Sequence, residues 1–152
     1  MFRNILVAWD GSEHATQALA EAVDIARTQE ARLTLLAVAA PLHLWPGQFV
    51  PPVTEADLRE AASKVALEGE ALVPAGVPVS SHVAYGHPGI ELLKLATAAN
   101  HDLIVMGSRG RGAMRSAVLG SVSHFVLNHA RLPVLVVRDG SENSDSALHD
   151  PA

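Results

Sequence analysis

A segment rich in glycine, serine and arginine could bind an anion. Residues 107–112 read Gly-Ser-Arg-Gly-Arg-Gly, and a further glycine is followed by serine at Gly120-Ser121. Glycine permits positive φ angles and lets backbone N–H groups approach a ligand, because no Cβ stands in the way. Such N–H groups bind phosphate at helix N-termini, and the hydroxyls of Ser108, Ser121 and Ser123 are further donors. This spacing therefore predicts an anion cradle.

Two well-known phosphate motifs are nevertheless absent from this segment. Gly107 and Gly112 have the spacing of a Walker A loop, but Ala113 follows where that loop requires lysine. The dinucleotide fingerprint also fails, because Arg115 stands where its third glycine would be. A glycine at a helix start costs stability, so either a phosphate or a closely packed strand must need the space beside Gly120.

Charge is distributed unevenly along the 152 residues. The chain carries 16 acidic and 11 basic residues, a net charge of −5, which argues against general nucleic-acid binding because such proteins have a basic surplus. The stretch 103–138, however, contains no aspartate or glutamate. Its basic residues are Arg109, Arg111, Arg115, Arg131 and Arg138. An acid-free stretch in an acidic protein suits a small anionic ligand, although chance in a largely apolar stretch explains it equally well.

Several other kinds of chemistry lack the residues that they need. The chain has no cysteine, which excludes disulfides and thiolate metal sites. None of its eight histidines forms an H-E-x-x-H motif, and no G-x-S-x-G nucleophile elbow is present. The longest nearly apolar run, residues 33–45, is shorter than the ~20 residues of a membrane span. We therefore expect a cytoplasmic protein without catalytic residues, a nucleic-acid partner or membrane insertion.

Short apolar runs alternate with stretches of helical periodicity, and this order places the glycine segment. The runs typical of strands are 3–9, 33–39, 77–85, 102–106 and 132–137, and the third is more polar and so nearer a sheet edge. Helical stretches separate these strands. Ser12 and Thr54 are suited to cap the first two helices, and Pro88 suits the first turn of the third. This pattern predicts a doubly wound α/β domain, a parallel sheet with helices on both faces. Ligands in such domains bind at the carboxyl ends of the strands, where the loops after the first and fourth strands should meet.

Asp10 lies in the first of these loops, which reads Asp10-Gly11-Ser12. Its carboxylate could hold Mg²⁺ through water or orient a ribose, and we favour such a ligand role. The alternative is that it only caps the following helix.

Three motifs together resemble the universal stress protein family. They are Val7-Ala8-Trp9-Asp10-Gly11-Ser12, the pattern Gly107-x2-Gly110-x9-Gly120-Ser121, and Pro133-Val134-Leu135-Val136-Val137. The resemblance covers residues 1–138 and implies a Rossmann-like, doubly wound sheet of five parallel strands with helices on both faces. The full glycine pattern implies the subclass of the family that binds ATP. The polar residues 139–152 are expected to form a disordered tail.

The resemblance also implies a set of binding residues. Phosphates and ribose would be held by Gly107, Gly110, Gly120 and Ser121. Asp10 would lie beside the nucleotide, and the backbone of Val38 would meet adenine. Further contacts are implied at Ala8, Ser108, Arg109, Val122 and Ser123. The implied ligand is ATP with Mg²⁺, which Asp10 could help to hold, and the implied assembly is a homodimer around the strand Pro133–Arg138.

One residue departs from the family pattern. Trp9 stands where smaller residues are usual, and it could narrow the pocket or fill space under the proline-marked loop 41–52.

Three functions remain open from the sequence. The first is an ATP-binding protein that acts as a nucleotide-dependent sensor or switch in the stress response. The second is a slow ATP hydrolase or phosphotransferase that phosphorylates itself on Ser121 or Ser123. The third is a nucleotide-free scaffold that works through its dimer surface. We favour the first, because no general base is evident for efficient phosphoryl transfer.

Overall fold

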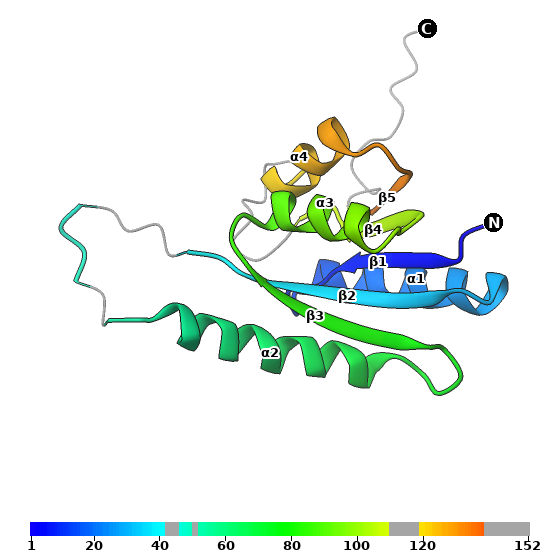
Figure 1. Cartoon of the computed structure of the whole chain (residues 1–152), viewed down its shortest axis with the longest axis horizontal. Coiled ribbons are helices and arrows are strands. Elements are labelled where there is room, and N and C mark those ends of the chain that lie inside the picture. The colour runs from blue at the N-terminus through cyan, green and yellow to red at the C-terminus, as the bar shows by residue number, and fades with distance from the viewer. Residues whose placement is uncertain (42–45, 50–51, 110–118, 139–152) are drawn as a thin grey trace, which may run out of the picture.

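The computed structural model describes residues 1–41, 46–49, 52–109 and 119–138, which form an α/β domain (Figure 1). The strands are β1 (Asn4–Ala8), β2 (Arg32–Ala39), β3 (Val79–Tyr85), β4 (Leu103–Gly107) and β5 (Val134–Val137). The helices are α1 (Glu13–Gln29), α2 (Glu55–Leu72), α3 (Pro88–Ala98) and α4 (Ser121–His129). The five strands predicted from the apolar runs are confirmed, with their ends shifted by one or two residues.

The strands form one parallel sheet in the order β3-β2-β1-β4-β5. The chain starts at the centre of the sheet, winds outward to β3, then crosses β1 to reach β4 and β5. Figure 1 shows α3 and α4 on one side of the sheet and α1 and α2 on the other. The predicted doubly wound fold is therefore confirmed, and its topological switch point lies between β1 and β4.

Alternate residues of the central strands face two apolar layers. In β1, Ile5 and Val7 pack with α1, whereas Leu6 packs with α3 and α4, and all three are fully buried. Because both faces of β1 and β4 are covered, these strands are apolar throughout rather than alternately polar. The edge strand β3 has exposed and half-buried residues only, as its polar sequence predicts.

Trp9, which follows β1, packs beneath α2. Its side chain is 4% exposed, and its Nε1 donates a hydrogen bond to the carbonyl oxygen of Val65 at 2.6 Å. Gly69 makes room for the indole, because a Cβ on Gly69 would lie 2.6 Å from Trp9 Nε1 and 2.9 Å from Leu35 Cδ1. Trp9 is thus a core residue under α2, a role that its sequence position did not reveal.

Side-chain caps fix where the helices begin. Ser12 caps α1, as predicted, because its hydroxyl accepts a hydrogen bond from the N–H of Ala15 at 3.1 Å. Thr54 caps α2 in a reciprocal capping box with Asp57. The hydrogen bonds from Thr54 also hold the pKa of the Asp57 carboxyl below its usual value.

His87 caps α3 with its imidazole, and His87→Ala is expected to lower the free energy of unfolding by about 1 kcal/mol. Nδ1 accepts from the backbone N–H groups of Gly89 at 3.1 Å and Ile90 at 3.3 Å. Urea unfolding measures the loss. His87→Asp supplies a carboxylate acceptor at the same place and should recover most of it. An equal loss in both variants would argue against the capping role.

At the amino-terminal edge of the sheet, Asp102 ties β4 to β1. Its Oδ2 accepts from the backbone N–H of Arg3 at 2.7 Å, and its Oδ1 accepts from that of Asn4 at 3.1 Å. The side-chain amide of Asn4 in turn donates to the carbonyl oxygen of Ala99 at 2.9 Å. These bonds hold the starts of the two switch-point strands together, at the opposite edge of the sheet from their loops.

His101, next to this group, should make stability fall in mild acid. The residue is 8% exposed, and burial lowers its pKa from the usual 6.5, while Asp102 and the carbonyl of Leu95 raise it and His82 and Arg32 lower it. The unfolded chain therefore binds a proton at a higher pH than the folded chain does. The free energy of unfolding should decrease as pH falls through 6.5 and below.

Urea unfolding between pH 7.5 and 5 tests this pH dependence. His101→Gln should flatten it, whereas the same change at the exposed His124 should leave it intact. An unchanged slope in His101→Gln would show that other groups cause the loss in acid.

Candidate functional site

The loops that follow β1 and β4 begin at the same edge of the sheet. Val7 pairs with Val105 in the parallel register, so the two strands end at similar heights. Asp10 comes directly after Trp9 in the first loop, and Gly107 is the last residue of β4. The structure confirms the prediction that these loops lie at the switch point.

Asp10 holds the turn into α1. Its Oδ1 accepts a hydrogen bond from the backbone N–H of Ser12 at 2.9 Å, and Gly11 between them has a φ of +76°. A positive φ is readily adopted by glycine, which explains the residue type in this turn. The structure therefore shows Asp10 in the capping role that was the alternative to ligand binding. Its half-buried carboxylate lies at the carboxyl edge of the sheet.

Gly107 lets α1 pack directly on the end of β4. A Cβ on Gly107 would lie 2.8 Å from the Cβ of His14 and 2.9 Å from its carbonyl carbon and oxygen. No side chain fits between these two backbones. Gly107 therefore brings the first turn of α1 against the end of β4.

On the other face of β4, hydrogen bonds join the strand to the start of α4. The carbonyl oxygen of Ser108 accepts from the N–H of Gly120 at 2.6 Å and from the hydroxyl of Ser123 at 3.0 Å. The Ser123 hydroxyl also lies 3.0 Å from the carbonyl oxygen of Gly120. Ser108 and Ser123 are 0% and 1% exposed, so this junction is buried.

Gly120 is needed by this close packing. A Cβ there would lie 3.2 Å from the carbonyl oxygen of Ser108 and 3.3 Å from the Cα of Arg109. The glycine φ is −68°, so its backbone conformation is open to any residue. Of the two reasons considered for Gly120, the approach of another backbone segment is the one that the structure shows.

The Ser108 hydroxyl is buried without a hydrogen-bond partner among the described residues. Leaving such a group unsatisfied costs roughly 1–3 kcal/mol, so buried hydroxyls almost always have a partner. This hydroxyl sits where β4 ends and α4 begins. It is the kind of group that a bound polar ligand satisfies.

The N-terminus of α4 points to the same edge of the sheet. Its N-cap, Gly120, offers no side chain to its N–H groups, and its first turn contains no acidic residue. Ser121 is exposed, and Val122 is half-buried against the apolar layer of α3 and α4. An uncapped helix N-terminus with no acid nearby favours an anion.

Ala8 and Val38 lie on the other side of the switch point. Ala8 pairs with Leu36, and Val38 is two residues further along β2, toward the carboxyl edge. Both side chains are half-buried in the apolar layer of α3 and α4. Their backbones can therefore face the edge while their side chains belong to the core.

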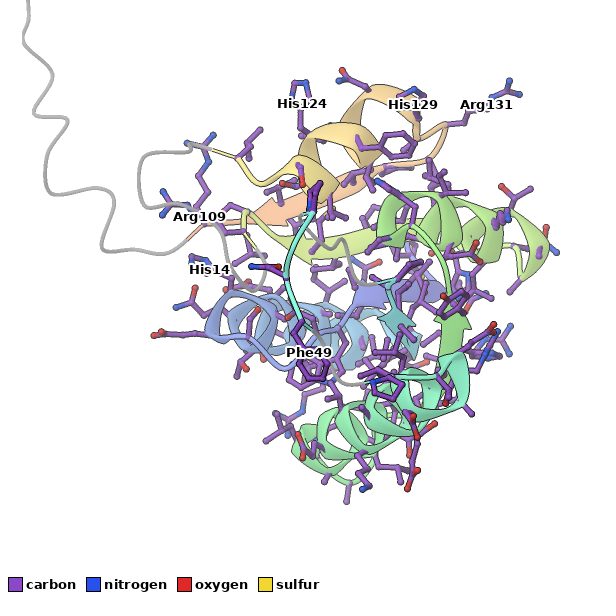
Figure 2. The ribbon with its side chains drawn as sticks, turned by 90° about the vertical axis from the view of Figure 1, so that its left-hand side faces the viewer. His14, Phe49, Arg109, His124, His129 and Arg131 are labelled. Carbon is purple, nitrogen blue, oxygen red and sulfur yellow. The ribbon has the colours of Figure 1, made fainter. Side chains whose placement is uncertain are left out.

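Arg109 follows Ser108 and is half-buried. In the view of Figure 2, Arg109 and His14 are labelled on the same side of the molecule, whereas His124, His129 and Arg131 lie along and after α4. Gly110, also predicted to bind phosphate, lies outside the described residues, as does the predicted tail 139–152.

His14 is a residue that the sequence analysis did not single out. It lies in the first turn of α1 against Gly107, and its Nδ1 is buried without a hydrogen-bond partner among the described residues. A histidine just after the N-cap of the helix that follows β1 was the available signal. Its closeness to Gly107 depends on contacts between segments almost a hundred residues apart in sequence, which no local pattern reveals.

Two absences concern the described residues only. Within 1–41, 46–49, 52–109 and 119–138, no group of three or more His, Cys, Asp or Glu side chains could hold a metal ion. In the same part of the chain, no helix is long and apolar enough to cross a membrane.

Comparisons with known proteins identify the family of this chain. The model of the universal stress protein family matches residues 1–138. A universal stress protein from Thermus aquaticus is 41% identical over 142 residues, which span 91% of this chain and 100% of that relative. Universal stress protein YxiE from Bacillus subtilis is 36% identical over 148 residues, which span 91% of this chain and 100% of that relative.

Solved structures share the fold. Universal stress protein UspA from Lactobacillus plantarum has a TM-score of 0.70 at 27% identity, over 90% of this chain and 98% of that one. A structure from Archaeoglobus fulgidus in complex with dAMP has a TM-score of 0.65 at 21% identity, over 89% and 97% of the two chains. One from Arabidopsis thaliana with AMP bound has a TM-score of 0.64 at 20% identity, over 95% and 97%.

Proposed function

We propose that this chain, which belongs to the universal stress protein family, binds ATP with Mg²⁺ at the carboxyl edge between β1 and β4. Its role would be that of a cytoplasmic, nucleotide-dependent sensor or switch in the stress response. The binding residues of this proposal are Ala8, Asp10, Val38, Gly107, Ser108, Arg109, Gly110, Gly120, Ser121, Val122 and Ser123. Asp10 would be the residue nearest to Mg²⁺.

The observation that carries the proposal is the unsatisfied hydroxyl of Ser108. It is buried at the junction of β4 with the uncapped N-terminus of α4, in a stretch of sequence without acidic residues. A phosphate at this junction would accept from the hydroxyl and from the first N–H groups of the helix together. An apolar ligand would satisfy neither.

The class of nucleotide has a second, independent support. The relatives solved with dAMP and with AMP hold adenine nucleotides on the same fold. Their low identity means that the fold alone is shared, so the extension to ATP rests on this chain's own glycine pattern. Gly107, Gly110 and Gly120 with Ser121 reproduce the full pattern that the ATP-binding subclass has.

Binding rather than catalysis is the proposed activity. Of the two serines considered for autophosphorylation, Ser123 is buried, and its hydroxyl is engaged with the carbonyl oxygens of Ser108 and Gly120. Ser121 is the exposed one. The alternative of a slow hydrolase would therefore depend on Ser121 alone as its phosphate acceptor.

A homodimer through the strand Pro133–Arg138 is part of the same proposal. β5 lies at the edge of the sheet and pairs with β4 on one side only. Leu135 is 36% exposed, and the other residues of β5 are half-buried. An apolar edge strand is protected when a second copy pairs with it. Sedimentation velocity of the full chain checks this assembly.

The experiment that tests nucleotide binding starts from freshly purified protein. Acid extraction and mass spectrometry identify any retained nucleotide, and calorimetric titration with Mg-ATP then gives the affinity. Retained nucleotide or a Kd in the micromolar range is expected. Failure of saturating Mg-ATP to bind or to raise the melting temperature would contradict the proposal and favour the nucleotide-free scaffold.

A further inference from the structure

We propose that His14 binds the distal phosphates of the nucleotide and thereby sets a preference for ATP over AMP. This inference rests on the proposed nucleotide site and assigns a specificity-determining residue to it. Two helices, α1 and α4, begin against the end of β4.

α1 and α4 approach the end of β4 from opposite faces of the sheet. α4 is joined to Ser108 through Gly120 and Ser123, as described above. α1 meets the preceding residue, because a Cβ on Gly107 would be 2.8 Å from the Cβ of His14. Both helices begin at the carboxyl edge of the sheet, so both N-termini flank the same short piece of backbone.

Each side of this backbone carries a buried polar atom without a hydrogen-bond partner among the described residues. On the α4 side it is the Ser108 hydroxyl, in a residue that is 0% exposed. On the α1 side it is Nδ1 of His14. A ligand that spans Gly107 from one face to the other would satisfy both, since an imidazole N–H donates well to a phosphate oxygen.

The charges around His14 suit a phosphate that arrives with its own counter-ion. Arg109 comes two residues after Gly107, against which His14 packs, and it adds a guanidinium near this end of β4. Asp10 and Glu13, close along the chain, are acidic and would repel a bare anion. Mg²⁺ on the phosphates would remove that repulsion, which fits a Mg-ATP ligand better than a lone phosphate ion.

The length of the phosphate chain decides which ligands reach His14. A nucleotide whose first phosphate lies at the N-terminus of α4 has its adenosine on the side of Val38 and β2. AMP has no further phosphate to extend across Gly107 toward α1. ATP has two, so only the longer chain contacts His14.

Calorimetric titration of the full chain with Mg-ATP, AMP and inorganic triphosphate tests this assignment. In His14→Ala, the Kd for ATP should rise about tenfold, the loss expected for one hydrogen bond to a charged group. The Kd for AMP should change by less than about twofold, on the same reasoning. His14→Gln retains a side-chain donor and should recover part of the ATP affinity.

Gln17 offers a matched control. It lies one turn further along the same face of α1, is half-buried, and also has a buried side-chain atom, Oε1, without a partner among the described residues. Gln17→Ala should leave the ratio of the ATP and AMP affinities unchanged. If it lowers that ratio as much as His14→Ala does, repacking of α1 is the cause and the assignment of His14 is wrong.

The remaining outcomes separate this inference from the proposed function. Equal weakening of ATP and AMP in His14→Ala, or no weakening of either, overturns the role of His14 and leaves the nucleotide site standing. Binding of inorganic triphosphate that depends on His14, without binding of either nucleotide, supports the anion site and overturns the adenine site. No binding of any of the three by the wild-type chain overturns both.

Discussion

Replacing Gly107 with alanine is expected to lower the free energy of unfolding by about 3 kcal/mol, the upper part of the usual range for overpacking. The added Cβ would lie 2.8–2.9 Å from the Cβ, carbonyl carbon and carbonyl oxygen of His14. Two of these are backbone atoms of a helix that packs on β1 and β4. The clash cannot be relieved by turning a side chain, so α1 must shift against the sheet.

Gly120→Ala is the matched comparison for Gly107→Ala. Its Cβ would meet Ser108 and Arg109 at 3.2 and 3.3 Å, and a shift of a few tenths of an ångström would relieve these contacts. We expect a loss of about 1 kcal/mol there. Urea unfolding followed by circular dichroism gives both values. A loss in Gly107→Ala no larger than in Gly120→Ala would show that α1 is not held against β4 as described.

Gly120→Val is expected to raise the Kd for Mg-ATP roughly a hundredfold, which is the loss of one or two hydrogen bonds to a charged group. The branched side chain would push the start of α4 away from Ser108 and break the 2.6 Å bond between the Gly120 N–H and the Ser108 carbonyl. The helix N–H groups and the Ser108 hydroxyl would then no longer converge on one phosphate. The rest of the domain should stay folded, because the added atoms would meet Ser108, Arg109 and Ser123 at the end of the sheet rather than the apolar layers of the core.

Ala98→Val controls for this substitution, because it adds methyl groups at an exposed position of α3. Calorimetry measures binding, and the melting temperature with sedimentation velocity establishes that each variant is folded and assembled. Normal ATP affinity in a folded Gly120→Val protein would mean that phosphates do not lie at the start of α4.

The architecture could be predicted from the sequence because burial on both faces leaves a plain pattern. Residues 5–7 and 103–106 are apolar without alternation, which is typical of a parallel sheet covered by helices on both faces. The ends of the strands are less sharply marked in the sequence. β5 starts at Val134 rather than two residues earlier, because Pro133 has no N–H to donate to a ladder.

The site was predictable where its residues are local and unpredictable where they depend on packing between distant segments. The spacing of Gly107 and Gly120 in the sequence marks both as candidate site residues, and the position of Ser12 before a helical stretch marks it as the cap of α1. The contact between Trp9 and Gly69 of α2, by contrast, cannot be predicted from the local sequence around either residue. The contacts of His14 and Ser123 likewise depend on how α1 and α4 pack on β4.

Asp102 fixes the relative position of the two switch-point strands, β1 and β4, at one of their ends. Its carboxylate joins the backbones of Arg3 and Asn4 to the start of β4, so the two strands are held together by hydrogen bonds at the amino-terminal edge. The loops that begin at Trp9 and Ser108 lie at the opposite, carboxyl ends of these strands. Because residues 5–7 also pair with residues 103–105 along the strands, the hydrogen bonds of Asp102 fix their register. That register in turn sets the relative heights at which Trp9 and Ser108 leave the sheet at the opposite edge.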